Sequence, residues 1–107
     1  MVQNAVRELR SVSPQLTDDL DTAQLAAATR HIDALVQPLG QDDIRALIAL
    51  LPKDGGPAAG LNWSILHAIE AAPAWPLWDV LVDRSNEWVQ IFRLRLANAG
   101  IEPPAED

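Results

Sequence analysis

The sequence predicts an all-α fold, and three observations lead to this prediction. Apolar residues recur at helical spacing in each long segment, and proline and glycine separate these segments. The alternation of apolar and polar residues that strands show is missing. Ala and Leu dominate over the β-branched residues that strands prefer. We therefore expect helices joined by short turns.

An apolar stripe predicts the first helix, and a serine followed by a proline predicts a helical turn after it. Four apolar residues share one face of the first segment: Val2, Ala5, Val6 and Leu9. This helix is expected to end near Ser11. Ser13 followed by Pro14 is typical of a helix start, so a short helical turn to about Leu20 is predicted.

Asp21 and Gln24 form a plausible capping pair at the start of the second long helix. Its apolar face is predicted to contain Leu25, Ala28, Ile32, Leu35 and Val36. Proline cannot continue a helix and glycine favours its end, so this helix is expected to stop at Pro38-Leu39-Gly40.

Asp42 and Asp43 open the third long helix, because carboxylates are favoured at the positive end of the helix macrodipole. Its apolar residues repeat at helical spacing until Pro52 closes it. Residues 53–60 are predicted to be a loop. Residues 61–72 are expected to form a helix that is apolar on most sides, which is typical of a central helix.

The last segment, residues 77–98, is expected to contain two helices, with Gly100 as a C-terminal cap. Residues 83–86 (Asp-Arg-Ser-Asn) indicate a break, because Ser and Asn prefer helix caps to helix interiors. One continuous bent helix is the alternative.

Short connections imply antiparallel hairpins, so five to six helices are expected to form either a bundle or a short HEAT-like stack. Residues 1–101 are predicted to be a single helical domain and residues 102–107 a solvated C-terminal tail.

The composition narrows the environment of the protein. Cysteine is absent from the 107 residues, which rules out disulfides and thiolate zinc sites and is compatible with a reducing compartment. The sequence contains neither the apolar run of a secretory signal nor one of membrane-spanning length. We therefore expect a soluble, cytoplasmic protein without a membrane segment.

The formal net charge of −7 favours a basic partner over a nucleic acid. Phosphate binding needs clustered Lys and Arg, and the longest basic cluster is Arg93 with Arg95. A basic protein would be attracted to such a surface. The alternative is that acidity only keeps the protein in solution.

No motif predicts catalysis, a metal or a cofactor, so we do not expect an enzyme. His67 and Glu70 have the i, i+3 spacing of di-iron carboxylate sites, but the second motif that such sites need is missing. His67 is therefore expected to be a half-buried polar residue. The glycine-rich loop 55–60 lacks the Lys and Ser/Thr that a phosphate loop requires. Catalysis by paired carboxylates stays open, because spatial pairing is not visible in a sequence.

The four tryptophans divide by context. Trp63 and Trp88 follow helical apolar stripes, so both are expected in the core. Trp75 lies between two prolines and Trp78 follows the second of them, where an indole either plugs one end of the domain or anchors a partner. Arg95 falls within an apolar face and is expected to pair with a carboxylate such as Asp79, Asp83 or Glu87.

Six residues are predicted to contact a protein partner: Asp42, Asp43, Asp54, Trp75, Trp78 and Asp79. Helix capping explains several of the acidic residues without any partner. Replacing Asp42 and Asp43 with Lys is expected to slow association with a basic partner while leaving folding nearly intact.

Residues 60–70 (GLNWSILHAIE) and 86–96 (NEWVQIFRLRL) resemble segments of small all-helical immunity proteins, which accompany bacterial contact-dependent or secreted polymorphic toxins. The resemblance implies a non-enzymatic protein that binds and blocks one cognate toxin. The acidic charge fits, since many such toxins are basic nucleases. Pairing of Arg93 and Arg95 with Glu70 or Glu87 would join the two segments. The alternative function is a helical adaptor or regulatory subunit that binds another cytosolic protein.

Overall fold

Helices are the regular elements of the computed structural model, which describes residues 1–103. They are α1 (Asn4–Val12), α2 (Thr22–Asp33), α3 (Gln41–Ala49), α4 (Leu61–Glu70), the 3-10 turn η1 (Trp78–Leu81) and α5 (Glu87–Asn98). The prediction of an all-α fold with five to six helices is confirmed. The predicted tail, residues 102–107, lies outside the described residues from position 104 onward.

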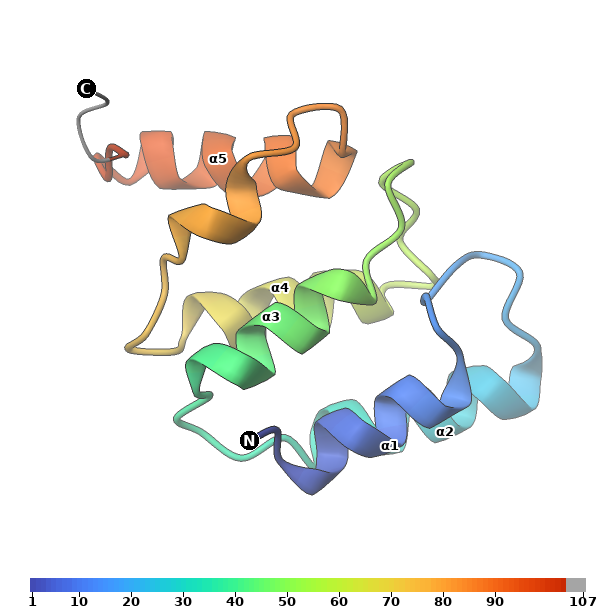
Figure 1. The fold of residues 1–107 in the computed structure, drawn as a ribbon. Coiled ribbons are helices and arrows are strands. Elements are labelled where there is room, and N and C mark those ends of the chain that lie inside the picture. The colour runs from blue at the N-terminus through green and yellow to red at the C-terminus, as the bar shows by residue number, and fades with distance from the viewer. Residues whose placement is uncertain (104–107) are drawn as a thin grey trace.

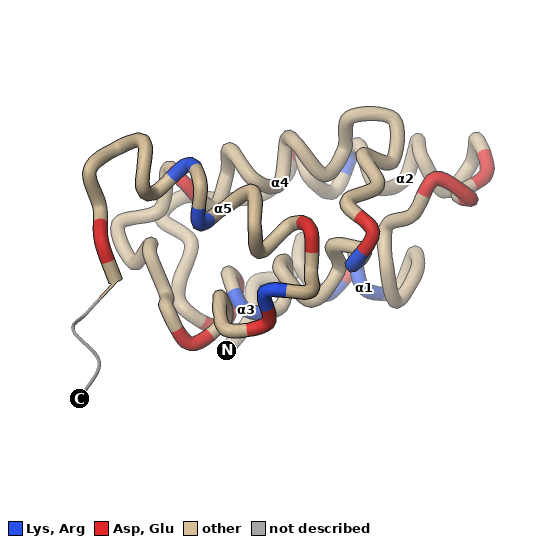
Figure 2. The backbone as a smooth tube through the Cα atoms, turned by 90° about the horizontal axis from the view of Figure 1, so that it is seen from above, with Lys and Arg blue, Asp and Glu red and all other residues tan. Residues whose placement is uncertain are grey.

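Helices α1 and α2 lie together at one end of the molecule, η1 lies against α5 at the other, and α3 and α4 lie between these two groups (Figure 1). Helix α1 packs against α2 and also against α3, while α2 packs against α4, and η1 packs against α5. Viewed from above, α1 and α3 lie on one side and α2 and α4 on the other (Figure 2). The molecule measures 46 × 27 × 20 Å. Residues 1–103 thus form a compact all-α globule.

One core cluster takes buried side chains from every helix, and α4 contributes several of them. Every long helix contributes fully buried side chains, among them Leu9, Ile44, Leu47, Ile65, Leu66 and Phe92. Helix α4 buries Leu61, Ile65, Leu66 and Ile69, as expected for a central helix. It also buries Asn62, whose amide donates to the carbonyl oxygens of Leu16 and Gly56 at 2.8 Å each. This side chain fastens two loops to the core.

Two predicted helix starts are confirmed by their hydrogen bonds. The Asp21 carboxylate accepts from the Gln24 backbone N–H at 2.8 Å, and the Gln24 side chain accepts from the Asp21 N–H at 3.0 Å. The Asn86 side chain accepts from the N–H groups of Trp88 and Val89 and so begins α5. The break at residues 83–86 is therefore real, and the segment before it contains only η1.

Two local predictions are wrong. Residues 14–20 form no helix, because the Leu16 N–H donates to the Leu50 carbonyl at 2.8 Å and draws the segment along the end of α3. Val36 is 66% exposed, since α2 ends at Asp33 and the helical phase that placed Val36 on the apolar face ends with it. A long-range hydrogen bond therefore explains the missing helix, and the early end of α2 explains the exposure of Val36.

Candidate functional site

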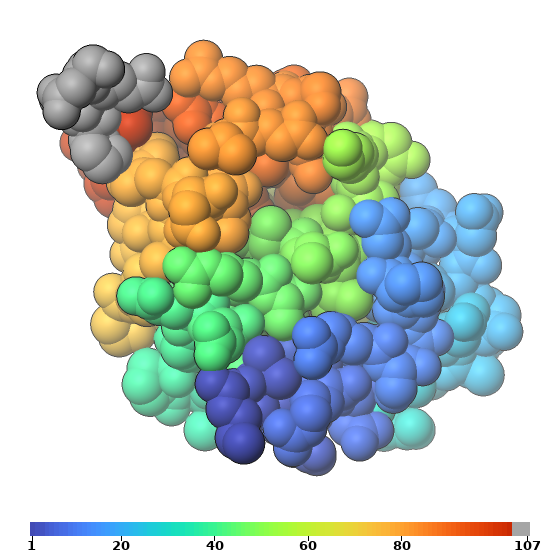
Figure 3. Space-filling view, viewed as in Figure 1, coloured from blue at the N-terminus to red at the C-terminus, as the bar shows by residue number. Residues whose placement is uncertain are grey.

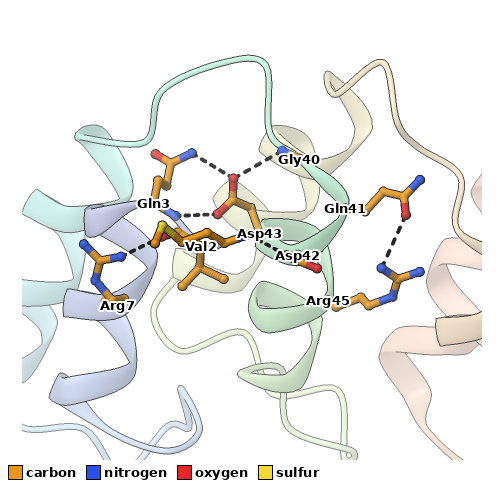
Figure 4. Close-up of polar contacts among 9 residues, drawn as sticks. Val2, Gln3, Arg7, Gly40, Gln41, Asp42, Asp43 and Arg45 are labelled. Atoms are coloured by element: carbon orange, nitrogen blue, oxygen red, sulfur yellow. Dashed lines mark hydrogen bonds and ion pairs between the residues drawn. The ribbon is translucent and has the colours of Figure 1, made fainter.

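Asp43 is a structural residue that joins two helices (Figure 4). Its side chain is 6% exposed and accepts from the Gln3 N–H at 2.8 Å, the Gln3 Nε2 at 3.2 Å and the Gly40 N–H at 3.2 Å. These bonds tie the start of α1 to the start of α3. Folding is therefore not expected to tolerate lysine at this position, which corrects the sequence-based expectation for the Asp42 and Asp43 pair.

The exposed aspartates Asp42 and Asp79 are already neutralised within the chain. Asp42 accepts from the N-terminal amine at 2.6 Å, and Asp79 accepts from Arg45 Nε at 3.1 Å. The hydrogen bond from the terminal ammonium lowers the pKa of Asp42, and the hydrogen bond from Arg45 lowers the pKa of Asp79. A basic partner would have to compete with these internal cations.

Trp75 and Trp78 make internal contacts. The ring centroids of Trp75 and Phe92 lie 5.0 Å apart, and Trp75 and Trp78 are both packed against the core. Arg93 stacks over Trp78 with its guanidinium carbon 5.9 Å from the ring centroid, and it donates to the Leu81 carbonyl at 2.9 Å. Both indoles are only partly buried, but these contacts favour the plug over the anchor as their main role.

Trp63 corrects a prediction, because it is 39% exposed and not a core residue. Its ring meets the buried Trp88 edge to face, with centroids 5.1 Å apart. The Trp88 Nε1–H donates to the Gly56 carbonyl at 3.2 Å. The exposed indole is therefore held by a fixed neighbour that also fastens the loop 53–60.

Around Gly55-Gly56 the fold brings together three exposed carboxylates from distant parts of the chain: Asp18, Asp54 and Glu87. A Cβ placed on Gly56 would lie 3.2 Å from Asp54 Oδ1 and 3.3 Å from Asp18 Oδ2. One placed on Gly55 would lie 2.6 Å from Glu87 Oε2. Within residues 1–103 the ion pairs involve other carboxylates. We call these three residues the turn carboxylates.

Backbone hydrogen bonds hold the turn carboxylates in place. Asp54 Oδ1 accepts from the Gly56 N–H and Asp18 Oδ1 from the Ala58 N–H, each at 2.9 Å. The Glu87 N–H donates to the Lys53 carbonyl at 2.9 Å. In the space-filling view the green loop lies between the light blue segment before α2 and the orange segment that leads into α5 (Figure 3). The negative charge therefore sits where three segments meet.

Beside this turn the surface is hollowed along α5. The hollow has a volume of about 290 Å³ and is lined by Gly55, Glu87, Gln90, Ile91 and Leu94. Leu94 is 62% exposed, and Ile91 is partly buried against the core. An apolar floor thus lies next to unpaired negative charge.

Arg95 pairs with Glu70, as the resemblance implied, and not with Asp79, Asp83 or Glu87, which the helix pattern had suggested. Among the described residues, Arg93 forms no such pair and donates to the Leu81 carbonyl. The Arg95 Nε and a terminal nitrogen donate to the two Glu70 oxygens at 2.7 and 2.8 Å. This bidentate bond lowers the pKa of Glu70 below its ordinary value. His67 Nδ1 lies 3.7 Å from Glu70 Oε1, and its side chain is 64% exposed, so the expectation of a half-buried histidine is wrong.

Residues 1–103 contain no group of three or more His, Asp or Glu side chains placed to hold a metal ion. In the same part of the chain, every helix is too short or too polar to cross a membrane.

Comparisons with protein-family models, curated proteins and solved structures gave no match to this chain.

Of the predicted contact residues, the structure brings only Asp54 to the turn carboxylates. Sequence reasoning missed Glu87 and the exposure of Trp63 and Leu94. A signal for Leu94 was available, because it lies outside the stripe that buries Trp88 and its neighbours. The approach of Asp18 carries no local signal, since it depends on a contact across 40 residues.

Proposed function

We propose that this chain is a non-enzymatic, acidic binding protein, and that its partner is a basic bacterial toxin that it neutralises. The observation that carries the proposal is the meeting of three exposed carboxylates without internal cations beside an exposed apolar surface. Exposed carboxylates without an internal ion pair attract a cationic partner. Complementary charge of this kind also speeds encounter.

An exposed indole close to the same loop can add affinity. Trp63 is half-exposed and held by Trp88, and partly exposed, well-supported tryptophans are enriched among the residues that dominate binding energy. A side chain that is already fixed loses little conformational freedom when a partner covers it.

The resemblance to immunity proteins supports the toxin as the partner. The two segments that carry it, residues 60–70 and 86–96, contain Trp63, Glu87 and Leu94. The bond between Glu70 and Arg95 joins these segments into one unit. Fold maintenance and partner binding thus share the same stretch of sequence.

A growth assay tests the proposal. The chain is co-expressed with the product of the adjacent gene, and complex formation is measured by pull-down. Growth arrest by the neighbour, relieved by the chain through a stable complex, supports an immunity protein. A stable complex with a harmless neighbour would instead identify a helical adaptor.

Matched charge reversals sharpen the assay. D18K/D54K reverses two unpaired carboxylates, whereas D42K/D79K reverses two that are paired internally, and both change the net charge equally. We expect the first variant to lose rescue and the second to retain most of it. Equal loss would contradict the assignment of the turn carboxylates. Circular dichroism checks that both variants remain folded.

A further inference from the structure

The hollow along α5 is a shallow surface with an apolar floor and an acidic end. Its lining on α5 spans Glu87 to Leu94, which is about two helical turns or about 10 Å. Ile91 and Leu94 are three residues apart and therefore adjacent on the helix surface. Trp88 and Arg95 contact α4, and Ile91 is i+3 from Trp88 and i−4 from Arg95, so it shares their face of α5. The apolar floor follows a helical ridge.

The negative charge around the hollow disfavours a second copy of this chain as its binding partner. Glu87 belongs to the hollow itself, and Asp18 and Asp54 flank the next residue of the turn. A second copy of this chain, docked by the same hollow, would bring two sets of these carboxylates face to face. Each copy also carries a net charge of −7, so this occupant is repelled.

The shape of the surface favours a helix as the binding element. The hollow adjoins α5 and a loop, and residues 1–103 offer no strand edge to which an extended segment could add. Helices pack by setting the ridges of one surface into the grooves of another. A helix with apolar residues at i, i+3 and i+4 would cover Ile91 and Leu94 and place its polar flank over the turn.

We infer that the hollow lined by Gly55, Glu87, Gln90, Ile91 and Leu94 binds a cationic amphipathic helix of a protein partner. Apolar side chains of that helix cover Leu94, and its Lys or Arg side chains meet Glu87 and the neighbouring carboxylates. The inference rests on the proposed function, because it names the part of a basic partner that enters the surface.

A peptide titration tests the inference without any toxin. The probe is a synthetic helix about five turns long, with Leu on one face and Lys on the other. A control peptide carries Glu in place of each Lys. Dissociation constants are measured by calorimetry with the full chain. L94N removes the exposed apolar side chain of the hollow, and V82N makes the same kind of change at a residue that is 75% exposed elsewhere. E87Q and E8Q form the matched pair for charge.

We expect the Lys peptide to bind and the Glu peptide not to bind. L94N should weaken binding about tenfold and E87Q about threefold, whereas V82N and E8Q should change it less than about twofold. Because Leu94 and Glu87 are exposed, the variants should keep the melting temperature of the parent chain, which thermal denaturation checks.

Three results would overturn the inference. They are equal effects of L94N and V82N, equal binding of the two peptides, and self-association of the chain that L94N abolishes in sedimentation experiments. The growth assay does not enter this titration. Rescue that is insensitive to L94N would contradict helix binding at the hollow but still support a toxin partner. Peptide binding without rescue would support helix binding at the hollow but contradict the toxin partner.

Discussion

A single buried carboxylate joins the first and third helices, and its replacement is predicted to be costly. Asn at position 43 keeps the shape of Asp43 but replaces one carboxylate oxygen with an NH₂ group. That group cannot accept the hydrogen bond that the Gln3 or Gly40 N–H donates to the oxygen of Asp43. We expect D43N to lower the free energy of unfolding by about 2 kcal/mol. Urea unfolding followed by tryptophan fluorescence measures it.

The control for this prediction is the neighbouring residue. Asp42 is exposed, so D42N should change stability far less than D43N does. Equal effects of the two substitutions would show that the Asp43 contacts do not stabilise the fold.

The Glu70–Arg95 pair predicts a stability contribution that depends on pH. The pKa of Glu70 is lowered in the folded chain from its ordinary value of 4.5 by the hydrogen bond with Arg95. A lowered pKa stabilises the fold above the ordinary value and ceases to do so as the pH falls through the folded-state pKa. E70Q should therefore cost about 1 kcal/mol near neutral pH and progressively less below about pH 4.5.

Urea unfolding of both chains between about pH 7 and pH 3 measures this difference. E8Q, at an exposed position of α1, provides the control. A cost of E70Q that stays constant over the whole range would contradict an ionic contribution.

At the residue scale, the sequence predicted chemistry better than location. Asp54 was identified from charge alone, and the structure places it beside Asp18 at Gly56, next to the residue that Glu87 approaches. Asp43 was grouped with Asp42 because both are acidic and adjacent. One faces the interior and the other solvent, since successive residues of a helix point about 100° apart. Two adjacent residues in the first turn of a helix can therefore have different roles, one stabilising the fold and the other lying on the surface.

At the scale of elements, the loop 53–60 fixes the geometry of the hollow, and Gly55 is its most constrained position. Gly55 has φ +78°, and a Cβ there would lie 3.1 Å from the Glu87 Cβ. Gly100 has a similar φ of +77° but nothing within 4 Å. We expect G55A to cost about 2 kcal/mol and G100A about 1 kcal/mol, because both add backbone strain and only the first adds a clash.

Chemical denaturation of the two variants measures the comparison. A cost of G55A equal to that of G100A would mean that Glu87 moves aside freely and that the loop does not hold α5 in place.

Helix starts could be predicted from the sequence wherever a side chain supplies the cap. Asp21 and Asn86 satisfy backbone donors within three residues, so their effect is visible in a short window. The segment 14–20 has the same local signal at Ser13. Its Leu16 N–H instead binds the carbonyl of Leu50, a partner 34 residues away that no local pattern reveals. Tertiary contacts override local propensity there.

At the scale of the whole molecule, the position of charge matters as much as its sum. The fold exposes many acidic residues at helix starts and turns, and several are neutralised by cations of the chain, as Asp79 is by Arg45. Within residues 1–103, unpaired charge remains at the turn carboxylates and also at exposed residues such as Glu8 and Asp33. Steering of a basic partner should therefore depend on which carboxylates are removed and not only on how many.

The last prediction separates these two effects. D18N/D54N and D42N/D79N each remove two of the negative charges that give the chain its formal net charge of −7. The two variants therefore have the same net charge. Asn at positions 18 and 54 keeps an oxygen for the Ala58 and Gly56 N–H groups, so the fold should be retained. At low ionic strength, D18N/D54N should slow association with the Lys peptide about tenfold and D42N/D79N about threefold or less.

Stopped-flow fluorescence measures both association rates. The difference between the variants should shrink as salt rises, because the screening length falls to about 8 Å at physiological ionic strength. Equal slowing of the two variants at every salt concentration would show that net charge alone steers the partner. Slowing confined to D18N/D54N would place the encounter at the Gly55-Gly56 turn, the end of the hollow where Glu87 meets the loop.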